Sequence, residues 1–288
     1  MAQRSRGRRA TAEKLGLLDN NEESNGKRRA GKKLPSDGAI FGRLVRKLFR
    51  ILFRVAATFF IGSVALVLLY RFIDPPLTPL MLIRPIEALG DGRFVWINKN
   101  WIDIDDVDPD LLKSVIASED ARFFQHGGID WKAVDAARKY NEKHKGEKLR
   151  GASTITMQCA RNVFLWQDRN YIRKALEAYF TYLIELIWGK KRILEVYINV
   201  IEWGHGTYGV DAAAQQYFGT SAETLTPQQA ALLTAVLPNP RRWSPAEPTE
   251  YINKKAKIIR ERAKAAKLDA LRKKESKETE KEKSGKKK

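Results

Sequence analysis

The chain has 288 residues and a formal net charge of +19 at pH 7, and the excess of positive charge lies at its two ends. Residues 1–50 contain 14 basic and five acidic side chains, and residues 251–288 contain 16 and six, so the segment between them is electrically balanced. A nucleic-acid-binding protein usually carries its basic residues on the folded domain, so this distribution argues against a nucleic-acid partner. The single cysteine, Cys159, excludes an intrachain disulfide.

The first predicted element is a membrane-spanning helix at residues 51–73. Its centre, residues 55–70, has no charged side chain, and a helix of that length covers about 24 Å, a little less than the roughly 30 Å of a bilayer core. A buried core helix and a cleaved signal peptide are the alternatives. More than 50 residues precede the stretch, and no small-x-small cleavage site follows it before Asp74. We therefore predict an uncleaved signal anchor.

Basic side chains predict the orientation of this anchor. They crowd its amino-terminal side at Arg43, Arg46, Lys47, Arg50 and Arg54. Positive residues stay preferentially in the cytoplasm, so residues 1–50 are predicted to be a disordered basic cytoplasmic tail and residues 74–250 an exported folded domain. Residues 251–288 are predicted to be a basic tail that is partly helical or disordered. An enzyme outside the cytoplasm has no supply of ATP or nucleotide sugars and needs an activated donor.

The exported domain is predicted to be mainly α-helical, with few strand signals. Asp108 followed by Pro109 is typical of a helix start. A second helix is expected at residues 171–188, ended by Gly189. Further helices are expected at residues 190–199, 210–218 and 226–237, and a polar helix running into a loop at residues 133–150.

The first candidate for chemistry is a glutamate near the end of the helix that starts at Pro109. Glu119 continues the apolar stripe of that helix at helical spacing, so its carboxylate is expected on the buried face. A capped or paired structural residue is one interpretation, and a general base or acid is the other. Asp120 and His126 either orient this carboxylate or fix the turn at residues 127–128.

A second candidate is a group of hydroxyl and small side chains at residues 151–158, followed by Arg161. Backbone N–H groups and hydroxyls at the start of a helix can face an anion, but they can also serve only as the helix N-cap.

The third candidate is a helix face that carries Arg173, Lys174 and Glu177 at spacings of three and four residues. A diphosphate site would use such cations, with the carboxylate orienting them or holding a metal ion. The alternative is a solvated ion pair.

In their order and spacing, these motifs resemble the family-51 glycosyltransferases of peptidoglycan synthesis, and most closely the monofunctional biosynthetic enzymes. The resemblance covers residues 101–248. It includes the Glu-Asp, phenylalanine, histidine and glycine of residues 119–127, the G-x-S-T-I-T-x-Q of residues 151–158 and the R-K-x-x-E of residues 173–177. It continues through I-L-E-x-Y-x-N within residues 191–199 and two alanine-rich segments near residues 212 and 230.

The resemblance implies a lysozyme-like helical domain, partly sunk in the outer leaflet, with a cleft for two lipid-linked glycan chains. It implies that Glu119 is the general base and that Glu177 is the second catalytic carboxylate. The implied substrate-binding residues are Asp120, Ser153, Thr154, Gln158, Arg161, Arg169, Arg173 and Lys174, and the implied structural residues are Phe123, His126, Gly127 and Asn199.

The same resemblance implies that the enzyme polymerises lipid II into β-1,4-linked strands with inversion and releases polyprenyl diphosphate. A Mg²⁺ or Mn²⁺ ion is expected at the diphosphate, and no organic cofactor. The expected partners are lipid II, the growing lipid-linked glycan, the membrane and other cell-wall synthesis or division proteins. The expected location is the bacterial inner membrane, with the catalytic domain in the periplasm.

Two positions depart from the family pattern: Met157 stands where glutamine is common, and Arg161 where lysine is frequent. A lysozyme-like enzyme that cleaves glycan and a non-catalytic cell-wall scaffold remain the alternatives. A bifunctional penicillin-binding enzyme is excluded because the chain has no K-T-G, and its S-x-x-K matches at Ser24 and Ser284 lie in the tails.

Overall fold

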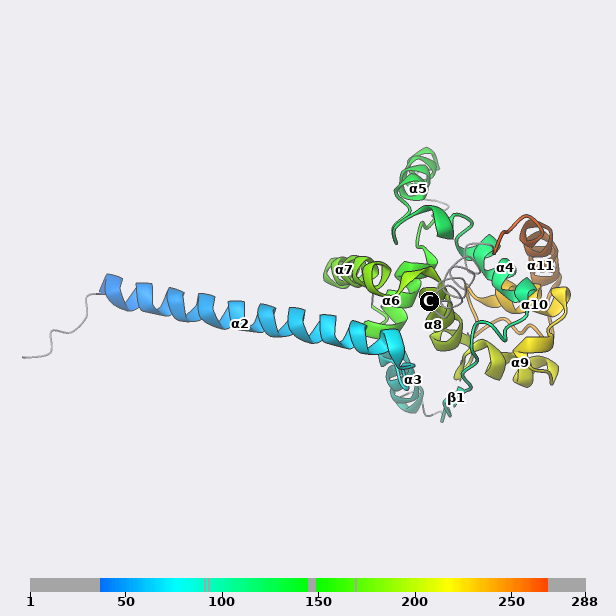
Figure 1. Cartoon of the computed structure of the whole chain (residues 1–288), viewed down its shortest axis with the longest axis horizontal. Helices are drawn as coiled ribbons and strands as arrows, with labels where there is room; N and C mark the ends of the chain where they lie inside the picture. The colour runs from blue at the N-terminus through cyan, green and yellow to red at the C-terminus, as the bar shows by residue number, and fades with distance from the viewer. Residues whose placement is uncertain (1–36, 91, 93, 145–148, 169, 269–288) are drawn as a thin grey trace, which may run out of the picture. The chain divides into compact units, whose positions relative to one another are not determined.

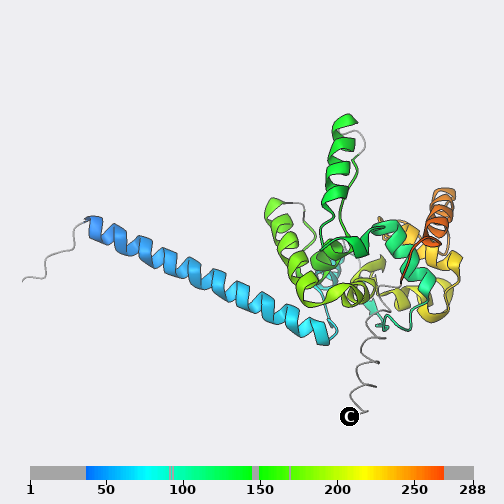
Figure 2. The ribbon, with the colours of Figure 1, turned by 45° about the horizontal axis from the view of Figure 1, so that its top comes forward.

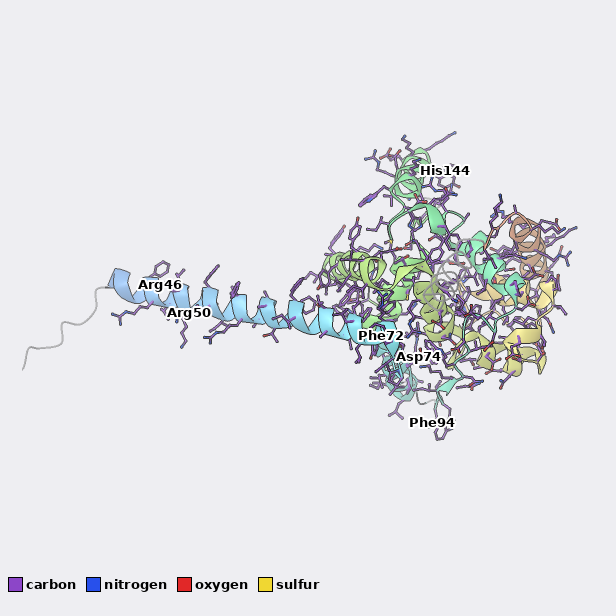
Figure 3. The ribbon with its side chains drawn as sticks, viewed as in Figure 1. Arg46, Arg50, Phe72, Asp74, Phe94 and His144 are labelled. Atoms are coloured by element: carbon purple, nitrogen blue, oxygen red, sulfur yellow. The ribbon has the colours of Figure 1, made fainter. Side chains whose placement is uncertain are left out.

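The computed structural model describes residues 37–268, apart from residues 91, 93, 145–148 and 169 (Figure 1). The chain divides into one unit that ends at Ala57 and a second that begins at Thr58. What is described of the first unit is the amino-terminal part of helix α2 (Asp37–Phe72). Arg46 and Arg50 lie on this part of α2 (Figure 3), and each donates its Nε–H to a carbonyl oxygen one turn earlier.

Helix α2 contains the stretch Phe41–Phe72, which is long and apolar enough to cross a membrane. The helix begins well before the predicted anchor at residues 51–73, so the end of the predicted tail is helical. The physical reason is that residues 38–50 contain leucine, arginine and lysine, which favour helix, and no proline to end it.

The carboxyl-terminal part of α2 packs within the second unit. Val67 is fully buried, and its carbonyl oxygen accepts a hydrogen bond from the Trp188 indole at 2.7 Å. The guanidinium of Arg192 donates to the carbonyl oxygen of Tyr70 at 3.0 Å and to Asp74 at 2.8 Å. Asp74 lies just beyond the end of α2 at Phe72 (Figure 3). These contacts attach the end of the anchor directly to the folded domain.

The second unit is mainly α-helical, as predicted. Its helices are α3 (Pro79–Gly90), α4 (Pro109–Glu119), α5 (Trp131–Lys143), α6 (Ile155–Phe164), α7 (Tyr171–Ile187), α8 (Gly189–Val200), α9 (Val210–Phe218), α10 (Pro227–Val236) and α11 (Glu250–Ala263), with short 3₁₀ helices η1 (Phe123–Gln125) and η2 (Ala222–Thr224). The strands β1 (Asn98–Lys99), β2 (Glu202–Gly204) and β3 (Thr207–Tyr208) form a small sheet in the order β1-β3-β2. Strand β3 runs parallel to β1 and antiparallel to β2.

Two groups of helices form the core. Helix α6 packs against α7 and α8, and α4, α10 and α11 pack together, as Figure 1 shows. The largest fully buried side chains are Trp203, Tyr197 and Tyr208, which come from the sheet and from α8. Helix α5 extends away from both groups (Figure 2), and Ala137 is the one residue that it buries among those described.

Local sequence signals account for several element boundaries. Asp108 caps α4 by accepting the N–H of Asp110 at 2.8 Å, and Thr226 forms a capping box with Gln229 at the start of α10. Helix α9 has the predicted bounds, and Gly219 ends it in the left-handed conformation. These signals are local, so the sequence alone could predict them.

The predicted boundary of the folded domain at residue 250 coincides with the start of α11, so the domain extends beyond it. Helix α11 buries Ile252, Ala256, Ile259 and Ala263 and packs against α4 and α10. Its apolar residues recur at helical spacing within a lysine-rich segment. The net positive charge of residues 251–288 suggests a solvated tail, although the apolar stripe indicates a packed helix.

The packing of α11 predicts different costs for two neighbouring isoleucines. Ile259 is 3% exposed and Ile258 is 51% exposed. Replacing Ile259 by alanine should lower the free energy of unfolding by about 2–4 kcal/mol, because a buried cavity is created. The matched Ile258→Ala variant should change it by less than about 1 kcal/mol. Thermal unfolding of both variants measures this, and equal melting temperatures would contradict the packing of α11 on the domain.

Candidate active site

The site begins at Glu119, the last residue of α4. Its side chain is partly buried, and the amide Nε2 of Gln158 on α6 donates to its Oε2 at 3.0 Å. Among the described residues, its other oxygen, Oε1, has only a long contact of 3.4 Å with the hydroxyl of Ser118. The carboxylate is therefore fixed through one oxygen, and the other retains its capacity to accept a proton.

Asp120 joins three segments of the chain. Its carboxylate contacts His126 Nε2 at 3.0 Å from both oxygens, and its Oδ2 accepts the backbone N–H of Ile155 at 3.1 Å. Asp120 is 7% exposed. These bonds link the end of α4, the loop after η1 and the start of α6, so Asp120 and His126 fix the local geometry. A direct contact of Asp120 with substrate stays a prediction.

The hydroxyl of Thr154 makes two bonds within the chain. Thr154 is the N-cap of α6 and accepts the N–H of Met157 at 3.1 Å, while its hydroxyl donates to the carbonyl oxygen of Gly128 at 2.5 Å. Thr154 is 3% exposed, whereas Ser153 is exposed. Capping therefore explains Thr154, and Ser153 is the hydroxyl of this pair that can reach a ligand.

Gly128, and not Gly127, is the glycine on which the turn depends. Gly128 has a φ of +95°, and a Cβ built on it would lie 2.7 Å from Thr181 Cγ2 and 2.9 Å from Glu185 Cγ. Nothing lies within 4 Å of a Cβ built on Gly127. The supporting role predicted for Gly127 therefore belongs to Gly128.

Glu177 lies in a buried cluster of charges on α7. It is 1% exposed, and it forms ion pairs with Arg173 and, at 2.5 Å, with Lys174. The Arg173 side chain is 9% exposed and that of Lys174 is 46% exposed. The alternative of a solvated surface pair therefore does not describe Glu177 and Arg173. Lys174 is the member of the cluster that presents its charge to solvent.

Arg161 lines a pocket of about 200 Å³ next to Gln158. The polar part of the pocket is formed by Arg84, Gln158, Arg161, Asn162, Gln167 and Glu202. Arg84 is paired with Glu202 at 3.1 Å, whereas the buried Nε of Arg161 has no hydrogen-bond partner among the described residues. The pocket thus combines a cationic group with the amide that contacts Glu119, and it is suited to an anionic or sugar group.

Comparison with known proteins shows the family of the chain. A family model described as transglycosylase matches residues 87–264. The chain belongs to this transglycosylase family. It is 51% identical over 221 residues to the biosynthetic peptidoglycan transglycosylase of Bdellovibrio bacteriovorus, covering 74% of this chain and 88% of the relative. It is 48% identical over 231 residues to the protein of the same name from Caulobacter vibrioides, covering 80% and 97%.

The remaining predicted residues occupy defined places in this transglycosylase domain. Phe123 is fully buried below the ammonium group of Lys190, which lies 4.5 Å from the ring centroid. Asn199 is fully buried and binds the backbone N–H and C=O of Ile102. Arg169 lies outside the described residues.

Met157, which departs from the family pattern, lies in the interior of this transglycosylase domain. Met157 is 5% exposed on α6, so its thioether packs inside the domain, and the amide nearest the site comes from Gln158.

Tyr197 belongs to the site and Lys255 feels the charge of Glu119, and neither was identified from the sequence. Tyr197 on α8 is 1% exposed and donates its hydroxyl to Gln158 Oε1 at 3.2 Å. Burial lowers the pKa of Lys255 on α11, and the charge of Glu119 opposes this effect. Tyr197 lies inside a motif that was recognised, so it could have been considered. The approach of Lys255 depends on the packing of α11 on α4, which no local pattern reveals.

The geometry at Gly128 predicts different effects for two adjacent alanine substitutions. Gly128→Ala should lower the free energy of unfolding by about 1–3 kcal/mol because it strains a left-handed position, and it adds the contacts with Thr181 and Glu185. Melting temperature should fall by about 2–4 °C per kcal/mol in a domain of this size. Gly127→Ala is the matched control and should melt close to the wild type. A larger loss from Gly127→Ala would contradict the assignment.

Proposed function

We propose that the protein is a peptidoglycan glycosyltransferase that polymerises lipid II into β-1,4-linked glycan and releases polyprenyl diphosphate. The observation that carries this proposal is the buried Glu177 with its paired cations Arg173 and Lys174, in a domain that also holds the partly buried carboxylate of Glu119. An enzyme that expels a diphosphate needs both a base and a group of cations.

Glu119 acts as the general base in this proposal. Its Oε1 takes the proton from the 4-hydroxyl of the lipid II acceptor while that oxygen bonds to the anomeric carbon of the donor. The bond from this carbon to the diphosphate oxygen breaks, and its electron pair leaves with the diphosphate. Because attack occurs on the face opposite an α-linked leaving group, the product is β-linked. Gln158 holds Oε2 at 3.0 Å and keeps the base in place.

Cationic side chains stabilise the leaving diphosphate. Lys174 is half exposed next to the buried Glu177, and Arg161 lines the pocket beside Gln158. Arg173 is fixed by Glu177 inside the domain, so its role is to set the charge and geometry of the cluster. We propose that Arg169 and Ser153 add contacts to the phosphate or sugar groups.

A divalent metal ion has no ready-made protein site among the described residues. They contain no group of three histidine, cysteine, aspartate or glutamate side chains that could hold a metal ion, and both oxygens of Glu177 are already paired with cations. The described residues therefore do not fit a dedicated metal site, and no step of the proposed reaction passes through a metal.

A glycan-cleaving enzyme is the second candidate for a lysozyme-like fold. Such an enzyme needs a carboxylic acid to protonate a sugar leaving oxygen, and it has no use for cations that neutralise a diphosphate. The cluster around Glu177 therefore favours polymerisation. A non-catalytic scaffold would need neither the base nor the cluster.

We further propose that the anchor in α2 holds the domain on the outer face of the bacterial inner membrane, with the amino terminus in the cytoplasm. The basic residues before Val55 support this orientation. Lipid II and the growing lipid-linked glycan would reach the site from the same membrane, and other cell-wall synthesis or division proteins would be further partners.

The role of Glu119 predicts a loss of turnover without a loss of fold. Glu119→Gln keeps the shape of the side chain and removes its basicity, so polymerisation of labelled lipid II should fall by roughly 10²-fold or more. Thermal unfolding of the same variant is the control and should give a melting temperature near that of the wild type. A well-folded variant with wild-type turnover would overturn the proposed mechanism.

The cluster on α7 predicts that substitutions at Glu177 and at Lys174 affect stability and turnover differently. Glu177→Gln leaves the buried Arg173 without its counter-charge, so it should cost roughly 3–5 kcal/mol of stability as well as turnover. Lys174→Met removes a half-exposed charge, so stability should change by less than about 1 kcal/mol, while turnover should fall about tenfold or more with little change in substrate binding.

The matched control for Lys174 is Lys264→Met. Lys264, which directly follows α11, pairs with Glu261 at 2.7 Å with the same spacing of three residues, and its loss should leave turnover unchanged. If Lys174→Met also left lipid II turnover within about twofold of the wild type, the cluster would serve only structure.

The proposed orientation predicts the outcome of reporter fusions. A reporter that works only outside the cytoplasm should be active when it is fused after Lys288, and a reporter that works only in the cytoplasm should be inactive there. The reverse pattern would contradict the orientation, because the basic residues before the anchor would then lie outside.

A further inference from the structure

We propose that Tyr197 is a positioning residue for the reaction, acting on Glu119 through the side-chain amide of Gln158. This inference rests on the proposed function, because it assigns a task to Tyr197 in holding the general base. Tyr197 lies on α8, Gln158 on α6 and Glu119 at the end of α4, so the three side chains connect three helices.

Two hydrogen bonds form the connection. The Tyr197 hydroxyl donates to Gln158 Oε1 at 3.2 Å, and Gln158 Nε2 donates to Glu119 Oε2 at 3.0 Å. A glutamine amide has one accepting and one donating end. Since the hydroxyl occupies the accepting end, the donating end faces the carboxylate.

The chemistry of the three groups allows one productive arrangement. If the amide turned over, its oxygen would face the negatively charged Glu119, and the two acceptors would repel each other. A hydroxyl accepts as well as donates, so Tyr197 does not forbid the turn. Its bond to Gln158 Oε1 restrains the position of the amide in the observed arrangement, and the negative charge of Glu119 selects the orientation in which the amide donates.

Tyr197 is suited to remain a donor throughout the reaction. Burial raises the pKa of Tyr197, and the nearby Glu119 raises it further. The phenol therefore stays protonated at the pH at which the enzyme works. It does not compete with Glu119 as a base, and its one bond to the site is the bond to Gln158.

The two oxygens of Glu119 therefore have different roles. The chain holds Oε2 through Gln158, whereas Oε1 has only the 3.4 Å contact with Ser118 among the described residues. A base must present one oxygen to the proton within hydrogen-bond reach. Fixing the other oxygen reduces the freedom of the carboxylate to turn away from the acceptor hydroxyl.

Other charged groups also interact electrostatically with Glu119 and Tyr197. Lys255 on α11 feels the charge of Glu119, and Arg161 on α6 and Asp120 after α4 act on Tyr197 with opposite signs. These groups are unchanged when the Tyr197 hydroxyl is removed, so a change in pH dependence after that removal reports the connection itself.

The test uses the full-length protein with labelled lipid II. Tyr197→Phe removes the hydroxyl and keeps the ring, so kcat should fall about tenfold while KM stays within about twofold. Loss of a fixed donor disfavours the charged carboxylate, so the acidic limb of the pH–rate profile should move to higher pH by on the order of 0.5–1 unit.

Tyr208→Phe is the matched control. Tyr208 is also fully buried, and its hydroxyl has no hydrogen-bond partner among the described residues. This variant should keep both the kcat and the pH profile of the wild type. It accounts for the general effect of removing a buried phenol hydroxyl.

A double-mutant cycle decides whether Tyr197 acts through the amide. In a Gln158→Met background, the further change Tyr197→Phe should alter kcat by less than about twofold, because the connection is already broken. A tenfold fall in that background would overturn the proposal, and so would an unchanged kcat and pH profile for Tyr197→Phe alone.

A second single variant serves if Tyr197→Phe does not fold. Gln158→Glu keeps the acceptor for Tyr197 and places an anionic oxygen against Glu119, so it should also move the acidic limb to higher pH. An unmoved limb would overturn the connection. Failure of the proposed function itself would look different, because Glu119→Gln would then polymerise lipid II as well as the wild type.

Discussion

The structure of the site depends on the carboxylate of Asp120, which joins the end of α4 to the start of α6 and to His126. Glu119 precedes it directly, so the same bonds that hold Asp120 determine where the general base stands. The second attachment is the hydroxyl of Thr154, which caps α6 and binds the carbonyl oxygen of Gly128. A substitution that broke the bonds of Asp120 or Thr154 would move the general base relative to every other group in the site.

The two carboxylates of the site, Glu177 and Glu119, lie in different surroundings, and this difference fits their proposed roles. Glu177 is fully enclosed and neutralised by two cations, whereas Glu119 keeps a partly exposed carboxylate that has one short hydrogen bond to the described residues. A buried ion pair costs free energy to desolvate, so its presence is better explained by a demand for fixed positive charge than by stability. The proposed chemistry has that demand, since the leaving diphosphate carries negative charge.

Local signals in the sequence were sufficient for several helix boundaries, but they predicted neither helix α3 nor the packing of α11. The cap at Asp108 and the capping box at Thr226 involve neighbouring residues, and the family motifs identified Glu119 and Glu177. The position of α11 and the approach of Lys255 to Glu119 arise from packing between distant segments, which a single sequence does not encode in a local pattern. The positive φ that distinguishes Gly128 from the adjacent Gly127 is a property of the folded backbone.

The central claim is that this domain builds glycan by inversion at the anomeric carbon. The most direct measurement is to incubate the purified full-length protein with labelled lipid II and to determine the length and linkage of the product. The account predicts long strands joined by β-1,4 bonds, together with one released polyprenyl diphosphate for each bond formed. Unpolymerised lipid II, or the shortening of glycan strands supplied in advance, would contradict it.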